Sequence, residues 1–487
     1  MQRLDRFPLV AAFVSLPLIG CCFASNQETA SLSKGEIVAK VVCSSDTSQS
    51  HALYLPRNYT PERCWPILYA FDPGARGNVP VERFREAAEK YGYIVAGSNN
   101  LRNGPWEPTV VAFRAMWDDS HQRFPLDAKR VYMAGFSGGA RVACTFARLL
   151  EGSVAGVIAS GAGFPVGPGQ EPSRDTPFIF FGTAGIRDFN LPELRGLDKT
   201  LDNLGVVHRI EVFSGGHDWA PENLSTAALE WMEIHAMKGG RREKDKALID
   251  ALFENHMKET RDAEESGDLA RAFHRWRSIV ADFDGLRDVS EVGSKLRQLE
   301  GSKELKNALR QEEKREKRIE ALVSEYWRAL NDVLGAIQTG QGGPMEIQQA
   351  VRELQLPYRR KQAQENKETE EGIAAGRFVV GLLVQSRERA MDAFAARDYA
   401  RAKLNMQIAA ECAPNNPFIL YTLARACALN KDRKGPLSAL RRSVENGFRD
   451  ADQIEKNPEF DSLHDLPRCV ELISQLQRKR SSPPPSS

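Results

Sequence analysis

The sequence predicts an α/β domain over residues 34–238, followed by an all-α region of helical repeats over 245–480. In the first part, short apolar segments alternate with helical segments, which is typical of a largely parallel sheet covered on both faces. An apolar strand, a Gly-x-Ser-x-Gly turn and a helix follow one another over 130–150. From about residue 240 the pattern becomes helical and contains few β-branched runs.

Apolar runs bounded by turn residues define the elements expected in the first domain. The segments 37–43 and 51–55 predict a hairpin at its start. Further strands are expected at 65–71, 93–97, 131–134, 156–160, 177–181 and 207–213, and helices at 82–91, 109–123 and 141–150. No internal apolar run is long enough to span a bilayer.

The first 25 residues have the order of a bacterial secretory signal. Two arginines give a basic start, and an almost wholly apolar segment covers 7–20. Residues 18–21 (Leu-Ile-Gly-Cys) resemble the lipobox of bacterial lipoproteins, which implies that Cys21 is lipidated and becomes the mature N-terminus. Cleavage near Ala24 and a short unprocessed anchor are the alternatives. We therefore expect a protein that is periplasmic, lipid-anchored to the envelope or secreted.

Length and charge set broad limits on the molecule. A chain of 487 residues predicts two to four domains. The formal net charge is +1, so composition gives no argument for a nucleic-acid or acidic partner.

Ser137 lies at the tip of the Gly-x-Ser-x-Gly turn, between a buried strand and a helix. This context is that of a nucleophile elbow, in which a sharp turn exposes the serine hydroxyl above the sheet. The turn needs glycine because side chains there would collide with the strand and the helix. The amino end of the helix would face developing negative charge. The sequence therefore predicts Ser137 as a nucleophile.

A serine nucleophile needs a base that accepts its proton. Three histidines follow Ser137 within the domain. His208 begins or lies within the last strand and His235 lies in the closing helix, so structural or surface roles are expected for both. His217 lies in a glycine-rich loop directly after the last strand, and such loops carry the chemistry of parallel sheets. His217 is the predicted base, against the alternative of a capping or surface histidine.

The base needs an acid that holds it in the right tautomer. Asp188 is the first acidic residue after the strand that ends at Gly182, and we predict it as that acid, with Glu193 as the fallback. A plain loop or capping role is the alternative for Asp188. The other acidic residues are disfavoured. Asp175 precedes the strand, Asp198 and Asp202 fall on the helix that follows, and Asp218 is adjacent to His217.

The tetrahedral anion formed in acyl transfer needs two hydrogen-bond donors. The backbone amide of Gly138, the residue after the nucleophile, is the first expected donor. The second should come from the loop after the strand at 67–71. Pro73 has no amide, so the backbone of Asp72 or Gly74 must donate, and the sequence does not decide between them.

Residues about 50–237 resemble the α/β-hydrolase fold, and most of all the secreted esterases related to polyhydroxybutyrate depolymerases and feruloyl esterases. The resemblance rests on 53–60 (LYLPRNYT), 130–139 (RVYMAGFSGG), 182–193 and 215–219 (GGHDW). It implies a catalytic triad of Ser137, Asp188 and His217 that transfers an acyl group to water without a metal or organic cofactor. Between Gly139 and Pro177 the chain is too short for a large cap domain, so we expect an open site.

Export would allow disulfides to form. Cys43 and Cys64 flank the first strands and are candidates for one bridge. Cys144 is expected to be a small core residue. Further cysteines are scattered along helices, at Cys412, Cys427 and Cys469, and no spacing resembles a metal site.

Two stretches of the helical region, near 257–285 and over 385–450, resemble tetratricopeptide repeats. Asp398 and Asp432 lie 34 residues apart, and each opens a comparable helix. A period of 34 with paired helices is the signature of these repeats, which bind peptides or proteins through extended surfaces. Simple packing against the first domain is the alternative role.

A long charged helix is expected between the two stretches, over 303–338, with a partial apolar stripe. Its charge run at 310–318 is expected to be a solvated face. A break is expected at 339–344, and the proline-rich end at 481–487 predicts a disordered tail.

The sequence therefore predicts an exported serine hydrolase, most of all a carboxylic-ester hydrolase acting on a small or polymeric ester. Two alternatives remain open. One is an envelope scaffold with an inactive hydrolase domain, whose repeats bind protein. The other is a serine peptidase of the prolyl-oligopeptidase type, which the missing β-propeller disfavours.

Overall fold

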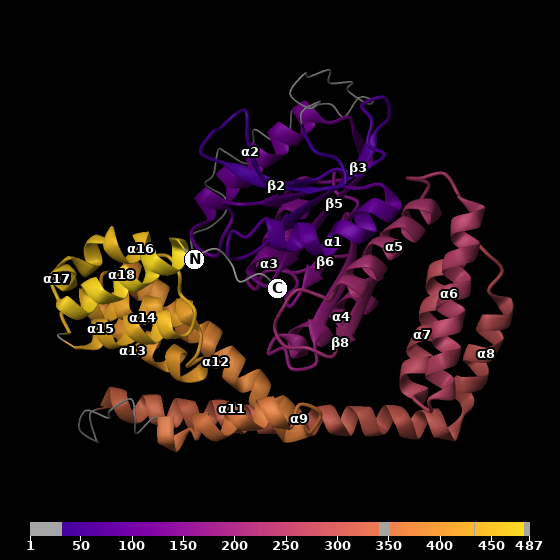
Figure 1. Cartoon of the computed structure of the whole chain (residues 1–487). Helices are drawn as coiled ribbons and strands as arrows, with labels where there is room; N and C mark the ends of the chain where they lie inside the picture. The colour runs from indigo at the N-terminus through magenta and orange to yellow at the C-terminus, as the bar shows by residue number, and fades with distance from the viewer. Residues whose placement is uncertain (1–31, 340–350, 433, 482–487) are drawn as a thin grey trace. The chain divides into compact units, whose positions relative to one another are not determined.

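The computed structural model describes residues 32–339, 351–432 and 434–481 (Figure 1). The chain divides into two compact units, Met1–Lys314 and Arg315–Ser487. In the described ranges, no helix combines the length and apolar character needed to cross a membrane. The expected signal segment with Cys21, most of the expected helix break and nearly all of the C-terminal tail lie outside the described residues, so these three features stay predictions.

One eight-stranded sheet forms the centre of the first unit. Its order is β1-β2-β4-β3-β5-β6-β7-β8, and all neighbouring pairs from β4 to β8 are parallel. Strand β2 runs antiparallel to both of its neighbours, which confirms the predicted hairpin. The strands are β1 (Ile37–Val42), β2 (Ser50–Tyr54), β3 (Trp65–Phe71), β4 (Ile94–Ser98), β5 (Leu126–Phe136), β6 (Gly156–Ser160), β7 (Ile179–Gly185) and β8 (His208–Phe213). This is the predicted α/β-hydrolase type of sheet.

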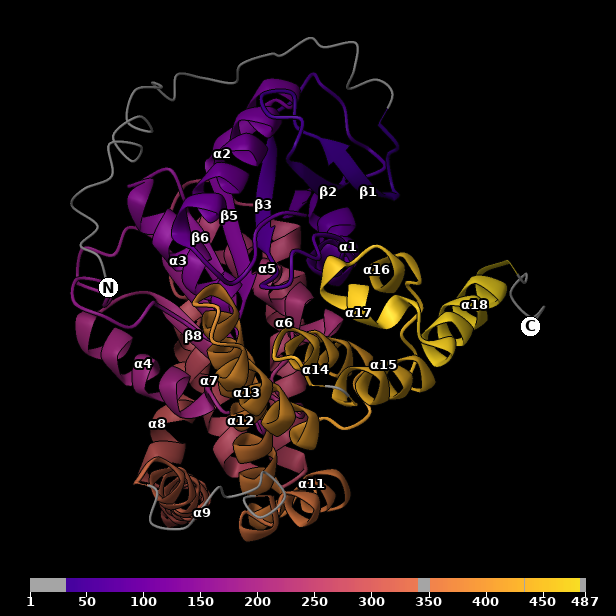
Figure 2. The same ribbon diagram turned by 90° about the vertical axis from the view of Figure 1, so that its left-hand side faces the viewer.

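Helices cover both faces of the sheet, as the alternation along β3 requires. Ile67 and Tyr69 face one apolar core, and Leu68 and Ala70 face the other. The first core is completed by α2 (Trp106–Arg123), α3 (Gly138–Leu149) and α4 (Leu191–Leu204), and the second by α1 (Asn78–Tyr91) and α5 (Glu222–Lys238). Figure 2 shows α2 and α3 on one side of the strands and α1 on the other.

Three further helices belong to the first unit, although they follow the change in composition near residue 240. They are α6 (Lys246–Glu265), α7 (Leu269–Phe283) and α8 (Ser290–Gly301). They share an apolar core with Ile234 and Met237 at the end of α5. The change in composition therefore marks the end of the sheet domain but not the end of the compact unit.

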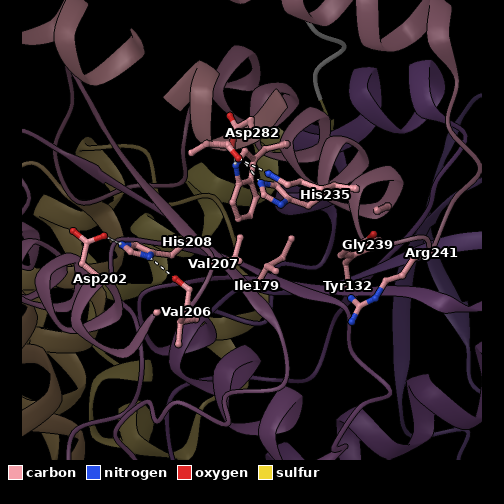
Figure 3. Close-up of a pocket in the computed structure, with 15 residues that line it drawn as sticks. Tyr132, Ile179, Asp202, Val206, Val207, His208, His235, Gly239, Arg241 and Asp282 are labelled. Atoms are coloured by element: carbon pink, nitrogen blue, oxygen red, sulfur yellow. Dashed lines mark hydrogen bonds and ion pairs between the residues drawn. The ribbon is translucent and has the colours of Figure 1, made fainter. Parts of the chain in front are cut away.

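A pocket of about 550 Å³ lies between β8, α5 and α7 (Figure 3). Its lining includes Ile179 and His208, the first residues of β7 and β8, and Tyr132 of β5, which pairs with Gly156 at the amino end of β6. Ser137 follows the carboxyl end of β5. The pocket and the serine therefore lie at opposite ends of the strands.

The long helix α9 (Lys303–Thr339) confirms the predicted charged helix and runs from the first unit into the second. Most of the charge run at 310–318 is exposed, as expected. Glu316 is the exception in that run: its side chain is half-buried, and it pairs with the buried Arg377 at 2.6 Å.

The second unit is helical throughout its described residues. After α9 its helices are α11 (Leu356–Glu365), α12 (Glu370–Ala395), α13 (Tyr399–Cys412), α14 (Pro417–Leu429), α15 (Gly435–Glu445), α16 (Asp452–Glu455), η4 (Pro458–Phe460), α17 (Asp461–His464) and α18 (Pro467–Ser481). An apolar core joins α12 through α18.

Three helix pairs share one turn geometry. Between α6 and α7, α12 and α13, and α14 and α15, a residue with φ of +57° to +79° precedes an aspartate. The amide of that aspartate donates to a carbonyl five residues back, at 2.9 to 3.2 Å. The aspartates are Asp268, Asp398 and Asp432, and each side chain accepts from an amide of the helix that follows. The paired helices therefore lie where the sequence placed them, while membership in the tetratricopeptide family and a role in binding stay predictions.

Candidate active site

Ser137 occupies a strained turn between β5 and α3. Its φ is +53° and its ψ is −119°, a conformation that costs a non-glycine residue about 1–3 kcal/mol. The turn is tight because a Cβ on Gly135 would lie 2.1 Å from the Gly139 carbonyl oxygen. A Cβ on Gly139 would lie 2.0 Å from the carbonyl oxygen of Phe71 in β3. Glycine at both positions lets the serine project at the carboxyl end of the sheet.

The structure brings Ser137, His217 and Asp188 together. His217 Nε2 lies 2.9 Å from Ser137 Oγ, and His217 Nδ1 lies 2.9 Å and 3.0 Å from the two Asp188 carboxylate oxygens. When Nδ1 carries the proton and donates to Asp188, Nε2 is left as the acceptor for the serine hydroxyl. The three side chains come from loops after β5, β7 and β8, so parallel strands deliver them to one edge of the sheet.

Asp188 is wholly buried and is held by its own loop. Its amide donates to Gly185 O at 2.9 Å, and its Oδ1 accepts from the amide of Asn190 at 2.8 Å. The same asparagine donates from its side chain to Gly161 O at 2.7 Å, which links this loop to the end of β6. The carboxylate therefore has a fixed orientation toward His217.

Two aromatic rings flank the imidazole of His217. The ring centroids of Phe136 and Phe189 lie 4.7 Å and 4.5 Å from that of the histidine. Gly161 has a φ of +66°, and a Cβ there would lie 3.1 Å from both His217 Cε1 and Asp188 Oδ2. These close neighbours limit rotation of the imidazole away from the serine.

The remaining sequence candidates have other partners. Glu193, the fallback acid, is wrong for that role because it forms a bidentate ion pair with Arg141 at 3.0 and 2.7 Å. His208 contacts Val206 O and Asp198, as a structural residue would. Neither side chain contacts His217.

Gly74 is wrong as the second anion donor, because its amide donates to its neighbour Asp72. The bond to Asp72 Oδ1 is 2.8 Å long. Asp72 itself has no exposed surface, so its own amide is closed to a substrate in this structure. Pro73 carries no amide, and the amide of Ala75 donates to Asp72 O at 3.1 Å. The loop therefore offers no open backbone donor among these four residues.

The Asp72 carboxylate has a bracing role that sequence reasoning missed. Besides the Gly74 amide, it accepts from Arg76 Nε and Nη2 at 2.9 Å each and from Trp219 Nε1 at 3.0 Å. Trp219 lies two residues after His217. Asp72 thus ties the loop after β3 to the loop that carries His217. No sequence motif marks this contact, because it joins residues 147 positions apart.

Asn103 also lies close to the turn of Ser137, and sequence reasoning missed it. A Cβ on Gly138 would lie 1.9 Å from Asn103 Oδ1 and 2.9 Å from its Nδ2. The side-chain amide thus occupies the space beside the residue that follows Ser137. An isolated asparagine in a loop gives no signal in the sequence.

The predicted bridge between Cys43 and Cys64 is wrong. Cys64 is disulfide-bonded, but Cys43 is a free, buried thiol. Strand β1 runs in the same direction as β3, because the β1–β2 and β2–β4 pairs are antiparallel and the β4–β3 pair is parallel. Cys43 follows the end of β1 and Cys64 precedes the start of β3, so the two lie at opposite ends of the sheet. Burial raises the pKa of the Cys43 thiol to about 12, and its sulfur lies 3.7 Å from His51 Nδ1.

Among the described residues, two groups of side chains have the composition of a metal site. One is Cys43, His51 and Asp119, and the other is Asp198, Asp202 and His208. Both Asp119 oxygens lie 2.9 Å from Arg123 Nε, so the guanidinium group of Arg123 already balances the charge of this carboxylate. Neither group includes Ser137 or His217.

No protein-family model matches the chain, and no curated protein matches its sequence. Solved structures with a similar fold include an S-formylglutathione hydrolase from Staphylococcus aureus, which is 15% identical with a TM-score of 0.33 and matches 41% of this chain and 98% of that one. A ferulic acid esterase is 18% identical with a TM-score of 0.34 over 40% of this chain and 96% of its own. A carboxylesterase from Bacillus cereus is 16% identical with a TM-score of 0.32 over 39% and 95%. At these values the likeness concerns fold alone.

Proposed function

We propose that this protein is a serine hydrolase that cleaves carboxylic esters. The observation that carries the proposal is the position of His217, which lies within hydrogen-bond distance of both the Ser137 hydroxyl and the Asp188 carboxylate. A strained nucleophile elbow and a wholly buried acid accompany it. Nucleophile, base and orienting acid in this arrangement are the parts that acyl transfer needs.

In the proposed reaction, Ser137 Oγ adds to the ester carbonyl carbon while its proton passes to His217 Nε2. The carbonyl π electrons move to the oxygen, and the amide of Gly138 at the start of α3 stabilises that charge. When the carbonyl re-forms, the C–O bond to the alkoxy group breaks, and His217 returns the proton to the leaving alcohol. Water then adds to the acyl carbon while His217 takes its proton. When the carbonyl re-forms, the bond from Ser137 Oγ to the acyl carbon breaks, His217 returns the proton to Ser137 Oγ, and the carboxylic acid is released.

The first test compares wild type and Ser137→Ala on short-chain p-nitrophenyl esters and on matched p-nitroanilide peptides. We expect ester turnover by wild type and its loss in the variant, because the alanine cannot form the acyl-enzyme. The variant should keep its melting temperature. Turnover of the peptides alone would favour a peptidase. Turnover that survives in Ser137→Ala would exclude the proposed site.

A further inference from the structure

The loop that carries Asn103 packs against the loop after β3. The Asn103 amide donates to Pro73 O at 3.0 Å, and Arg102 forms an isolated antiparallel bridge with Gly74. These contacts fix the backbone of Asn103 between the loop after β3 and the amino end of α3. The residue is therefore held beside Gly138, whose amide is the first donor in the proposed reaction.

The side-chain amide of Asn103 is close to the first donor. The hypothetical Cβ of Gly138, 1.9 Å from Asn103 Oδ1, is attached to the same α-carbon as the Gly138 N–H. Asn103 is exposed, and in the described part of the chain no hydrogen bond engages its side chain. Turning the amide about Cβ–Cγ exchanges its oxygen and nitrogen, so the group can present a donor beside Gly138.

Among Asp72, Pro73, Gly74 and Ala75, no backbone amide is open to fill this role. The Gly74 amide is taken by Asp72 Oδ1 and the Ala75 amide by Asp72 O, and Asp72 has no exposed surface. An anion with a single donor would lose much of its stabilisation, because removal of one such donor costs about 100- to 1,000-fold in kcat.

We propose that the Asn103 side chain donates the second hydrogen bond to the tetrahedral oxyanion. This inference rests on the proposed function. When Ser137 Oγ bonds to the carbonyl carbon, Asn103 Nδ2–H points to the oxygen that gains the electron pair, and Gly138 N–H donates from the other side. No bond to Asn103 forms or breaks. The substrate carbonyl then lies between Gly138 and Asn103, which makes Asn103 a catalytic residue.

The test uses Asn103→Ala and Asn103→Asp in the full chain with p-nitrophenyl acetate. We expect kcat to fall about 100- to 1,000-fold in Asn103→Ala, with KM changed much less, because the bond forms mainly in the transition state. Asn103→Asp keeps the shape but replaces the donor by a negative charge, so its loss should be at least as large. Melting temperatures should stay close to wild type, since no hydrogen bond engages this exposed side chain among the described residues.

Asn100→Ala is the matched control in the same loop. The Asn100 side chain accepts from the amide of Ser50 at 2.9 Å, so it faces β2 rather than Ser137. The kcat of Asn100→Ala should therefore stay close to that of wild type. A kcat for Asn103→Ala within about threefold of wild type would overturn the inference while Ser137-dependent turnover upheld the proposed function. A wild type that neither hydrolyses esters nor reacts at Ser137 with a fluorophosphonate would overturn both.

Discussion

At the scale of single residues, the site depends on one imidazole held from several sides. Asp188 fixes Nδ1, Ser137 lies at Nε2, and two phenylalanine rings flank the plane. The backbone strain at Ser137 is a local cost that the surrounding sheet and helix must offset. Orientation, rather than the mere presence of these groups, is what the buried carboxylate contributes.

Asp188→Asn should therefore reduce kcat by roughly 10⁴-fold, because an asparagine stabilises the wrong tautomer of the base. KM should change little, since Asp188 is wholly buried and does not face the substrate. Steady-state kinetics on p-nitrophenyl acetate would measure both. Glu193→Gln is the control, because Glu193 pairs with Arg141 and should leave the tautomer of His217 unaffected. Equal losses in the two variants would contradict the assignment of the acid.

At the scale of elements, charged contacts join helices to the sheet away from the site. His208 at the start of β8 lies 2.8 Å from Val206 O through Nδ1 and 3.1 Å from Asp198 Oδ1 of α4 through Nε2. Burial lowers the pKa of His208, but the hydrogen bonds to Asp198 and Val206 and the charges of Asp198 and Asp202 outweigh it, so the pKa is raised. An imidazolium satisfies both acceptors, and α4 is therefore tied to β8 most firmly when His208 is charged.

Because the pKa of His208 is raised, we expect His208→Gln to lower the free energy of unfolding by an amount that depends on pH. A histidine whose folded-state pKa exceeds its unfolded value of about 6.5 contributes stability fully below that value and loses it as the pH rises through the folded pKa. The difference in unfolding free energy between wild type and His208→Gln should thus be largest below about pH 6 and shrink above neutrality. Urea titrations from pH 5 to 9 would measure it. A difference that stays constant over that range would show that His208 does not titrate through this contact.

At the scale of the whole molecule, one buried carboxylate, that of Asp282, connects the sheet domain to the helices that follow it in the first unit. Asp282 of α7 accepts from Trp231 Nε1 at 2.9 Å and from Arg209 of β8. It also lies 3.3 Å from His235 Nε2 (Figure 3). Burial raises the pKa of Asp282, but Arg209, His235 and His256 together lower it below its ordinary value. A charged Asp282 therefore locks α7 onto α5 and β8, beside the shared apolar core.

Asp282→Asn should destabilise the first unit by about 3 kcal/mol at pH 7, because it removes the buried charge that pairs with the half-buried Arg209 and leaves that arginine only the more distant Glu211. Asp284→Asn, at an exposed position two residues on, should cost less than about 0.5 kcal/mol. The wild-type contribution should disappear as the pH falls below about 3.9, where a carboxyl with a depressed pKa loses its charge. Urea denaturation of both variants would decide the matter, and equal midpoints would refute a locking role.

The sequence by itself determined the elements and the chain order of the site. The strands, the elbow at Ser137, the loops of Asp188 and His217 and the paired helices all leave local signals, because apolar periodicity, glycine turns and aspartate caps act between near neighbours in the chain. The proposed triad could be named because strand direction alone determines which loops share an edge.

Only the tertiary structure decided the contacts between distant segments. Asp72 reaches Trp219, Asn103 covers Gly138, and Asp282 receives Arg209, yet none of these pairs is marked by spacing. The disulfide prediction failed for the same reason, since the ends of the sheet at which Cys43 and Cys64 lie depend on how β1, β2 and β4 pair. Such contacts follow from strand pairing and from the packing of loops, and these are settled by the free energy of the whole fold rather than by local sequence.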